Sequence, residues 1–492
     1  MTVADTTALM DSQTWSGKIF DGGWIPPGGG EYPVIEPATG NTLGTAGRAN
    51  SADVQRAAAR AAEAQPAWAR LPFDARAQVL RRAAALWEQH APEVMGWLMR
   101  ESGATPPMAG FQIHVANQEC YAAAALAAQP YGDLLRSEAP RLSMARRLPA
   151  GVVGVIAPFN APLILSIRSV APALALGNAV LLKPDPRTAV CGGVSLARVF
   201  EEAGLPPGLL HVLPGGAEIG EEVITDPHVH VISFTGSTAA GRLVGALAAK
   251  HLKRVHLELG GNSALIVLDD VDLDRAVAAG AWGSFFHQGQ ICMATSRHLV
   301  HERIADAYAG RMAAIAEGLT VGDPAGGPVA LGPIIDQRQR DRIHELVTSS
   351  VSAGAHLAAG GTYEGLFYRP TVLDHVTSEM PAFAQEIFGP VAPVVPFATL
   401  DEAAALASNT EYGLSLGIMA GNVMKALELA ERIPSGIVHI NDQTVNDEAA
   451  APFGGVGASG TGSRLGGADW NLDAFTETQW VTISGEIGPR EL

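Results

Sequence analysis

GVVGVIAPFNAP, residues 151–162, decides the fold because it begins an alternation of short apolar strands and helices. The first expected strand is Val152–Ile156, and a helix at 166–176 follows it. Further strands are expected at 180–182, 209–213, 229–234 and 255–257, with helices at 189–203, from 218 and at 238–250. Strands rich in Val, Ile and Leu that are joined by helices predict a parallel sheet covered on both faces. Ligands bind beyond the carboxyl ends of such strands, so the candidate binding turns are 157–162, 183–186, 214–216 and 235–237.

The chain on either side of this unit has other patterns. Residues 1–50 are rich in Gly, Pro and Thr and are expected to be extended. Helices are expected from Ser51 to Trp87, with Asp74 as an N-cap, and at 110–128. A second α/β unit is expected from Leu259, with strands at 265–268, 298–301, 371–373, 416–419 and 437–440 and helices at 273–286, 304–319, 337–354 and 424–433. Segments 141–148 and 479–484 resemble exposed strands without an evident partner of their own, and an unpaired strand edge favours association.

Length, charge and cysteine usage narrow the class of protein. A chain of 492 residues is too long for one core, so two or three domains are expected. The formal net charge of −17 argues against nucleic acid or an anionic membrane as a partner, and no apolar run has membrane-spanning length. No secretory signal is visible, and the three cysteines form no close pair. We therefore expect a cytoplasmic protein with neither a disulfide framework nor a metal site.

Several catalytic templates fail. Pro214 stands where the first glycine of the usual dinucleotide fingerprint belongs, and Arg242-Leu243 replaces the Lys-Ser/Thr of a phosphate loop. GLSLG, residues 413–417, matches the serine-hydrolase motif literally. A nucleophile elbow, however, needs a strand before the serine and a helix after it, and the expected order here is the reverse.

Cys292, in HQGQICM at residues 287–293, is the candidate nucleophile. A free thiol has a pKa of about 8.5, and its thiolate fraction is strongly nucleophilic. A buried structural cysteine is the simpler alternative. Two further blocks favour chemistry, LELGGN at 257–262 and QEIFGP at 385–390. Together the three blocks resemble the NAD(P)-dependent aldehyde dehydrogenase superfamily, and the resemblance covers nearly the whole chain.

This resemblance implies the aldehyde dehydrogenase fold. That fold is α/β, with a Rossmann-like parallel-sheet cofactor domain, an α/β catalytic domain and a small β element for oligomerisation. Residues 1–128 and 149–258 are then the cofactor-binding domain, and 259–440 the catalytic domain. Segments 129–148 and 475–492 are implied as the oligomerisation strands of a homodimer or homotetramer. Residues 441–474 are implied as a return segment to the cofactor domain and an active-site loop.

The resemblance also implies catalytic roles. Cys292 attacks an aldehyde carbonyl, and the Asn160 side chain stabilises the resulting alkoxide together with the Cys292 backbone N–H. Hydride leaves to NAD or NADP, and Glu258 then activates water to hydrolyse the thioester. The glutamate at 258 favours release of a carboxylic acid over transfer of the acyl group to coenzyme A. Glu477 matches a further glutamate to which a proton-relay role is given.

For the cofactor, the resemblance implies that Lys183 holds the adenosine ribose and Glu386 the nicotinamide ribose. The full implied set is Ile156, Ala157, Pro158, Phe159, Lys183, Asp185, Gly216, Gly220, Phe234, Thr235, Gly236, Ser237, Leu259, Glu386 and Phe388. Pro186 stands where most NAD-preferring members carry a ribose-binding glutamate, with Asp185 one place earlier. Either NAD or NADP is therefore expected as the cofactor.

The expected substrate is a small-molecule aldehyde. The blocks HQGQICM, RSVAP at 168–172 and PFGG at 452–455 are most similar to the aromatic branch of the family, the benzaldehyde, vanillin and salicylaldehyde dehydrogenases. Ile164, Ile291, Met293 and Phe453 are implied as an apolar funnel for a ring, with core packing as the alternative. The alternative functions are an aliphatic aldehyde or semialdehyde dehydrogenase, a cofactor-free thiol esterase that uses Cys292 and Glu258, and a catalytically silent relative.

Overall fold

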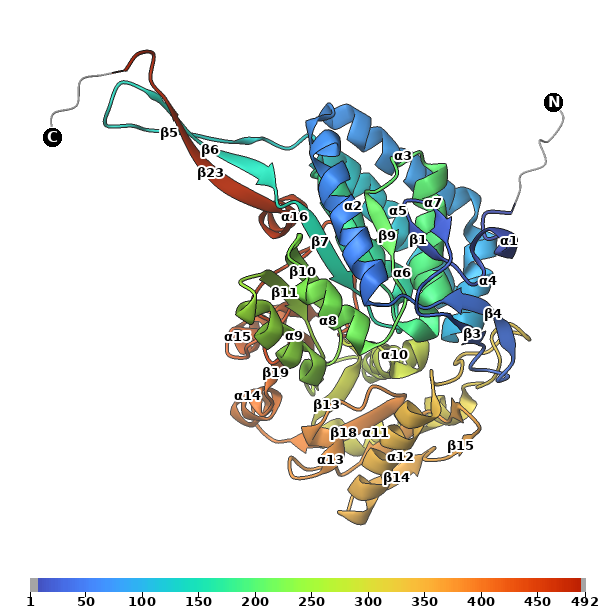
Figure 1. Cartoon of the computed structure of the whole chain (residues 1–492). Helices are drawn as coiled ribbons and strands as arrows, with labels where there is room; N and C mark the ends of the chain where they lie inside the picture. Colours follow the sequence, from blue (N-terminus) through green and yellow to red (C-terminus); the bar gives the residue numbers. More distant parts are fainter. Residues whose placement is uncertain (1–7, 488–492) are drawn as a thin grey trace, which may run out of the picture.

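The computed structural model describes residues 8–487, in which two seven-stranded sheets and a three-stranded arm form the framework (Figure 1). The first sheet has the order β11-β10-β7-β8-β9-β1-β2. Its strands are β1 (Ile19–Asp21), β2 (Trp24–Ile25), β7 (Val152–Ile156), β8 (Ala179–Lys183), β9 (Leu210–Val212), β10 (Val229–Thr235) and β11 (Arg254–Glu258). The strands from β7 to β11 are parallel to their neighbours, as expected, and β1 and β2 add an antiparallel edge.

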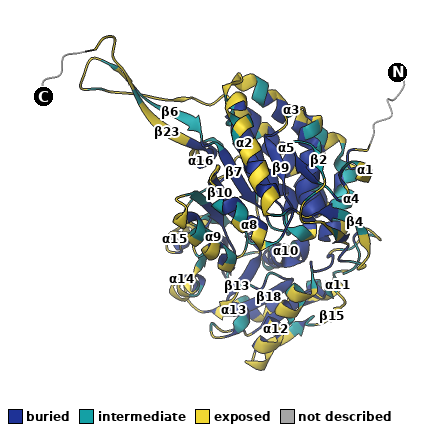
Figure 2. Ribbon diagram, in the orientation of Figure 1, coloured by how far each residue is buried: buried dark blue, intermediate teal, exposed yellow. Residues whose placement is uncertain are grey.

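Helices cover both faces of this sheet. Successive side chains of a strand point to opposite faces, and every residue of β7 and β8 is buried. The helices are α2 (Ser51–Arg70), α3 (Phe73–Gln89), α4 (Ala91–Ser102), α5 (Pro106–Leu126), α6 (Pro162–Ala175), α7 (Ser195–Glu202), α8 (Ala217–Thr225) and α9 (Thr238–Lys250), after a short α1 (Ser12–Trp15). Helix α6 is buried along its whole length because α5 packs over it, whereas α2 presents one exposed face (Figure 2).

One local prediction in this unit was wrong. Asp74 is not an N-cap, because α3 begins at Phe73 and Pro72 holds the cap position. The helix expected at 189–203 is present as a π-helical turn, η2 (Val190–Val194), that continues directly into α7, and a short 3₁₀ turn, η1 (Pro186–Thr188), precedes it. Asp185 caps η1, because its carboxylate accepts the N–H of Arg187.

The second sheet has the order β14-β17-β18-β13-β12-β20-β21. Its strands are β12 (Ser263–Val267), β13 (Thr295–His301), β14 (His356–Ala359), β17 (Thr371–Asp374), β18 (Val391–Phe397), β20 (Ser415–Met419) and β21 (Ile437–Ile440). The accompanying helices are α10 (Leu273–Phe285), η3 (Phe286–Gly289), α11 (Glu302–Gly318), α12 (Gln337–Ser352), α13 (Pro381–Ala384), α14 (Leu400–Ser408) and α15 (Val423–Ala430). Small hairpins and a last helix complete the described chain, namely β3 (Glu31–Ile35) with β4 (Thr42–Gly47), β15 (Tyr363–Glu364) with β16 (Phe367–Tyr368), β19 (Tyr412–Gly413) with β22 (Val456–Gly457), and α16 (Ala468–Phe475).

Strand β18 lies inside this sheet, although the sequence did not predict it. Its sequence, VAPVVPF, contains Pro393 and Pro396, and proline removes a ladder donor from a central strand. The register explains the tolerance. Residues 391–393 pair with β17, whereas residues 394–397 pair with β13. Each half of β18 therefore pairs with a neighbouring strand on one side only, which leaves room in the ladder for a proline that has no N–H to donate.

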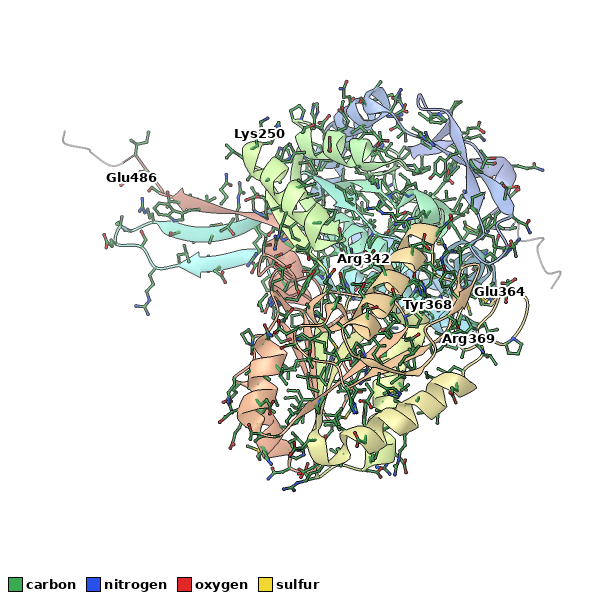
Figure 3. The ribbon with its side chains drawn as sticks, turned by 90° about the horizontal axis from the view of Figure 1, so that it is seen from below. Lys250, Arg342, Glu364, Tyr368, Arg369 and Glu486 are labelled. Carbon is green, nitrogen blue, oxygen red and sulfur yellow. The ribbon has the colours of Figure 1, made fainter. Side chains whose placement is uncertain are left out.

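The arm consists of β5 (Gly132–Leu135), β6 (Leu142–Pro149) and β23 (Thr476–Ile483), all antiparallel. The two segments thought to lack partners therefore pair with each other. The arm projects from the body in Figure 1, and Figure 3 shows it from below with Glu486 beyond the end of β23. The predicted cofactor domain begins at residue 1 and the predicted oligomerisation strand ends at residue 492, so residues 1–7 and 488–492 of these two segments lie outside the described part of the chain. Within residues 8–487, no helix combines the length and apolarity needed to cross a bilayer.

Candidate active site

The carboxyl edge of the first sheet gathers residues from four strands. Ile156 is in register with Lys183 on one side and Phe234 on the other, and Thr235 is in register with Glu258. The chain leaves this edge through the turn before α6, the turn before α9 and the segment Leu259–Asn262. The parallel topology therefore places most of the predicted binding turns at one edge.

A cavity of about 480 Å³ opens at this edge and is lined by residues of both α/β units. The predicted residues that line it are Pro158, Phe159, Asn160, Thr235, Gly236, Ser237, Leu259, Cys292, Glu386 and Phe388. The lining residues that sequence reasoning missed are Leu165, Arg187, Thr238, Ala239, Gly260, Asp336, Arg338, Gln339, Arg342 and Tyr412. Five of the missed residues come from η1 and from α12 or its N-cap; Figure 3 labels Arg342 on that helix. No local sequence pattern predicts these five residues as part of the site, because they reach the cavity only through the packing of the two α/β units.

Cys292 lies between η3 and β13, directly against the Gly260-Gly261 segment. A Cβ added to Gly261 would approach the Cys292 carbonyl oxygen to 2.4 Å, so only glycine allows this contact. Burial, reinforced by the negative charges of Glu386 and Glu258, raises the pKa of the Cys292 thiol to about 12. The sulfur is therefore protonated at neutral pH in the absence of ligands.

Glu258 is the last residue of β11 and is only 4 % exposed. Neither of its carboxyl oxygens has a hydrogen-bond partner within the described chain. Burial raises its pKa well above the ordinary value, against the opposing charges of Arg464 and Arg168. A buried carboxyl group with free oxygens that acts electrostatically on a thiol is characteristic of a functional proton acceptor.

Asn160 occupies the turn between β7 and α6 and is 5 % exposed. It lines the same cavity as Cys292. Glu258 does not line this cavity, but its charge acts on the Cys292 thiol, so its carboxyl group lies within electrostatic range of the sulfur.

The cavity has the features of an anion site at the start of α9. Ser237 caps this helix, and Thr238 and Ala239, its first residues, line the cavity. The N-terminus of a helix presents free N–H groups and partial positive charge to phosphate. Arg187, Arg338 and Arg342 add cationic side chains to the lining.

Elsewhere in the lining, Glu386 accepts the N–H of Gly261 over 3.0 Å, and burial raises the pKa of its carboxyl group to about 7. The ring of Phe388 lies 5.9 Å from that of Phe159, and the Arg187 guanidinium lies 4.2 Å from the Phe159 ring centre. These donors, acceptors and aromatic faces fit a dinucleotide.

Several predicted cofactor residues stand behind this lining. Lys183 is buried at the end of β8, and burial lowers its pKa. Both carboxylate oxygens of Asp185 accept hydrogen bonds from Arg187. The remaining members of the set are Ile156, Ala157 and Phe234 at the strand ends, Gly216 at the N-cap of α8 and Gly220 within that helix.

Glu477 does not reach the cavity. It pairs with Arg254, the first residue of β11, whereas Glu258 is the last residue of that strand. The length of β11, roughly 13 Å at the rise of a strand, separates the two positions. The proton-relay prediction for Glu477 is therefore not supported, because the arm directs this side chain to the other end of the strand.

An apolar cluster surrounds the cysteine on the side of the 441–474 segment. Ile291, Met293 and Phe453 belong to it, with Ala294, Leu414 and Val445, and Cys292 packs against it. Ile164 is buried on α6 but lies outside this cluster. Three of the four predicted funnel residues are thus together.

A buried ion-pair network borders the cluster. Arg168 on α6 pairs with Glu119 on α5 and with Asp447 on the segment that carries Phe453. Its guanidinium lies 4.7 Å from the centre of the Phe453 ring. Burial raises the pKa of Glu119 to about 7, and Arg168 opposes this shift. The network fixes the segment to the two helices beneath it.

This arrangement defines a class of protein: an α/β protein in which the carboxyl edge of a parallel sheet, with the features of a nucleotide-binding site, shares a cavity with a cysteine of a second α/β unit. The sequence matches the model of the Aldehyde dehydrogenase family over residues 24–481, and the chain belongs to that family.

Named relatives match nearly the whole chain. A vanillin dehydrogenase of Amycolatopsis sp. is 67 % identical over 480 residues, which are 98 % of this chain and 99 % of that protein. A benzaldehyde dehydrogenase [NAD(+)] of Pseudomonas putida is 48 % identical over 470 residues, 95 % and 96 % of the two chains. Among solved structures, a salicylaldehyde dehydrogenase from Pseudomonas putida G7, complexed with salicylaldehyde, superposes with a TM-score of 0.93 at 35 % identity over 96 % of this chain and 99 % of that one.

Proposed function

We propose that this chain oxidises an aromatic aldehyde to the carboxylic acid with NAD or NADP. The observation that carries the proposal is the shared cavity of Cys292 and Asn160, with the unpartnered carboxyl group of Glu258 acting on the same thiol. The names of two relatives, a vanillin dehydrogenase and a benzaldehyde dehydrogenase, support the choice of substrate.

The chemistry divides among three groups of the chain. The Cys292 thiolate attacks the aldehyde carbon, and the N–H groups of the Asn160 side chain and the Cys292 backbone stabilise the oxygen that becomes negative. A nicotinamide held in the cavity would supply the acceptor for the hydride of this carbon. Glu258 then takes a proton from water, and the water oxygen attacks the thioester on Cys292, which releases the acid and the sulfur.

Two features support use of either cofactor. The benzaldehyde dehydrogenase relative carries NAD(+) in its name. In this chain Pro186 supplies no carboxylate against a 2′-phosphate, and Arg187 neutralises Asp185. Lys183, Glu386 and the start of α9 would hold the ribose and phosphate groups.

A panel of aldehydes tests this assignment. Benzaldehyde, vanillin and hexanal are each assayed at 340 nm with NAD and with NADP. We expect kcat/KM at least tenfold higher for the aromatic aldehydes. Preference for hexanal or for a semialdehyde would overturn the aromatic assignment. Hydrolysis of 4-nitrophenyl acetate without reduction of either cofactor by any aldehyde would favour the thiol esterase, and inertness towards both would favour a silent relative.

We further propose that the chain forms a homodimer or homotetramer through the arm. Leu134 is 78 % and Trp480 65 % exposed, a high value for large apolar side chains. Light scattering of the full chain and of Trp480→Glu should give an oligomer and a smaller species, respectively. A monomeric full chain would refute the proposal.

The three free cysteines support a reducing compartment, and we propose the cytoplasm, which cell fractionation tests.

A further inference from the structure

We propose that His287 is a positioning residue that fixes the backbone of Asn160 relative to Cys292. Its Nε2 lies 2.6 Å from the carbonyl oxygen of Asn160, a residue 127 positions away in the sequence. His287 is 1 % exposed and belongs to η3, the turn that leads into Cys292. One hydrogen bond thus joins the segment of the nucleophile to the turn of the predicted oxyanion donor.

The acceptor determines the state of the imidazole. A carbonyl oxygen can only accept, so Nε2 carries the hydrogen. Nδ1 is then a bare acceptor, and it is buried without a partner within the described chain. Burial lowers the pKa of His287 to about 4, so the ring is neutral at physiological pH. A fixed neutral donor holds its partner without placing a charge beside the thiol.

The Asn160 carbonyl has no helical donor to satisfy it. Asn160 precedes Ala161, the N-cap of α6, and the first bond within that helix goes to the Ala161 carbonyl, which accepts the N–H of Leu165. A buried carbonyl outside a helix needs a donor from elsewhere. His287 supplies it.

The backbone around His287 is held in a conformation that only tertiary contacts can maintain. His287 and Gln288 both adopt the left-handed region, with φ of 50° and 56°, which costs energy for residues other than glycine. Anchors on both sides hold the turn. The Gln288 amide donates to the carbonyls of Gly103 and Pro333, and Gln290 accepts the N–H of Ile335. Strain held by a network beside a reactive group is typical of a positioned functional turn.

The inference rests on the proposed function, because it assigns His287 a role through Asn160. The matched variants are His287→Gln and His287→Met. Both side chains extend over the same number of heavy atoms, but only glutamine has an N–H that can replace Nε2–H. We expect His287→Met to lower the single-turnover rate of cofactor reduction by about 10- to 100-fold with little change in the KM for aldehyde. His287→Gln should restore the rate to within about threefold of the wild type.

A double-mutant cycle with Asn160→Ala separates this role from general damage. If His287 acts through Asn160, His287→Met should lower the rate less than about threefold in the Asn160→Ala background. Equal losses in both backgrounds, or equal activity of the Gln and Met variants, would overturn the inference. Full activity of Asn160→Ala would instead refute the oxyanion assignment of the proposed function.

A second buried histidine serves as the control. His298 on β13 bonds Ser284 and Tyr308, away from the cavity. His298→Gln should lower thermal stability without changing the single-turnover rate. If His287→Met is insoluble, His287→Ala replaces it as the donor-free variant, with the same two outcomes deciding.

Discussion

Arg187 of η1 donates to Asp336, the N-cap of α12, over 2.6 Å, and this ion pair joins the two α/β units at the cavity that both units line. The same guanidinium lies over Phe159 and pairs with Asp185. Because Arg187 is a cation that lines the proposed cofactor cavity, Arg187→Ala should raise the KM for NAD and NADP by roughly 10- to 100-fold, the loss of one charge-assisted hydrogen bond, with a smaller change in kcat. Arg275→Ala, at a 90 % exposed side chain on α10, is the control and should change neither constant. An unchanged KM in Arg187→Ala would contradict a role in cofactor binding.

Asp447 should matter for stability because its partner is buried. Asp447→Asn leaves the Arg168 charge with Glu119 alone in the interior, and breaking one side of a buried pair typically costs about 3–5 kcal/mol. The surface pair between Asp401 and Arg432 provides the control, and Asp401→Asn should cost less than about 1 kcal/mol. Calorimetric comparison of the two thermal midpoints measures the difference. Equal midpoints would mean that the buried pair adds nothing to holding the 441–474 segment.

Alkylation of Cys292 by iodoacetamide should be slow at neutral pH and should keep rising with pH. With a pKa near 12, the thiolate fraction of the ligand-free enzyme grows about tenfold from pH 8 to pH 9. Mass spectrometry of the labelled chain follows the rate, and Cys292→Ala gives the background from the buried Cys120 and Cys191. A rate that is half-maximal near pH 8.5 and then levels off would show that the thiol behaves as an ordinary exposed one, whose pKa is about 8.5.

Glu258→Gln should separate the two half-reactions. The amide cannot take a proton from water, so the thioester persists, and we expect a burst of cofactor reduction of about one equivalent followed by a steady rate lowered about 10²- to 10⁴-fold. Cys292→Ala should give neither burst nor turnover. Rapid-mixing absorbance at 340 nm measures both phases. Full steady-state activity of Glu258→Gln would remove the base assignment.

The activity of the wild-type enzyme should rise with pH across the neutral range. Both Glu258 and Cys292 have raised pKa values, so the forms that react, a carboxylate and a thiolate, become more populated as pH increases. The pH dependence of kcat/KM for benzaldehyde checks the sign. A decline between pH 6 and pH 8 would contradict the roles given to these groups.

Local sequence patterns predicted the helices and strands whose residue types favour one kind of secondary structure. The Val/Ile/Leu strands from 152 to 257 occur where the periodicity indicates, because buried parallel strands must be apolar on both faces. Strand β18 escaped prediction because its two prolines contradict the local preference, and only the one-sided pairing of each half allows them. The pairing of β6 with β23 escaped because the partners are more than 300 residues apart.

The amino-acid sequence alone predicted the fold class, and it selected Cys292, Glu258 and Asn160 as candidate catalytic residues through the motifs in which they stand. Only the tertiary structure decided which groups stand beside them. Arg187 and α12 reach the cavity through packing of the two α/β units. Glu477 lies on the arm and pairs with Arg254 instead of reaching the cavity. His287 contacts the Asn160 carbonyl through a turn whose left-handed backbone is unfavourable for a histidine. Contacts between distant segments depend on how sheets and helices pack against one another, and this information is absent from any single stretch of sequence.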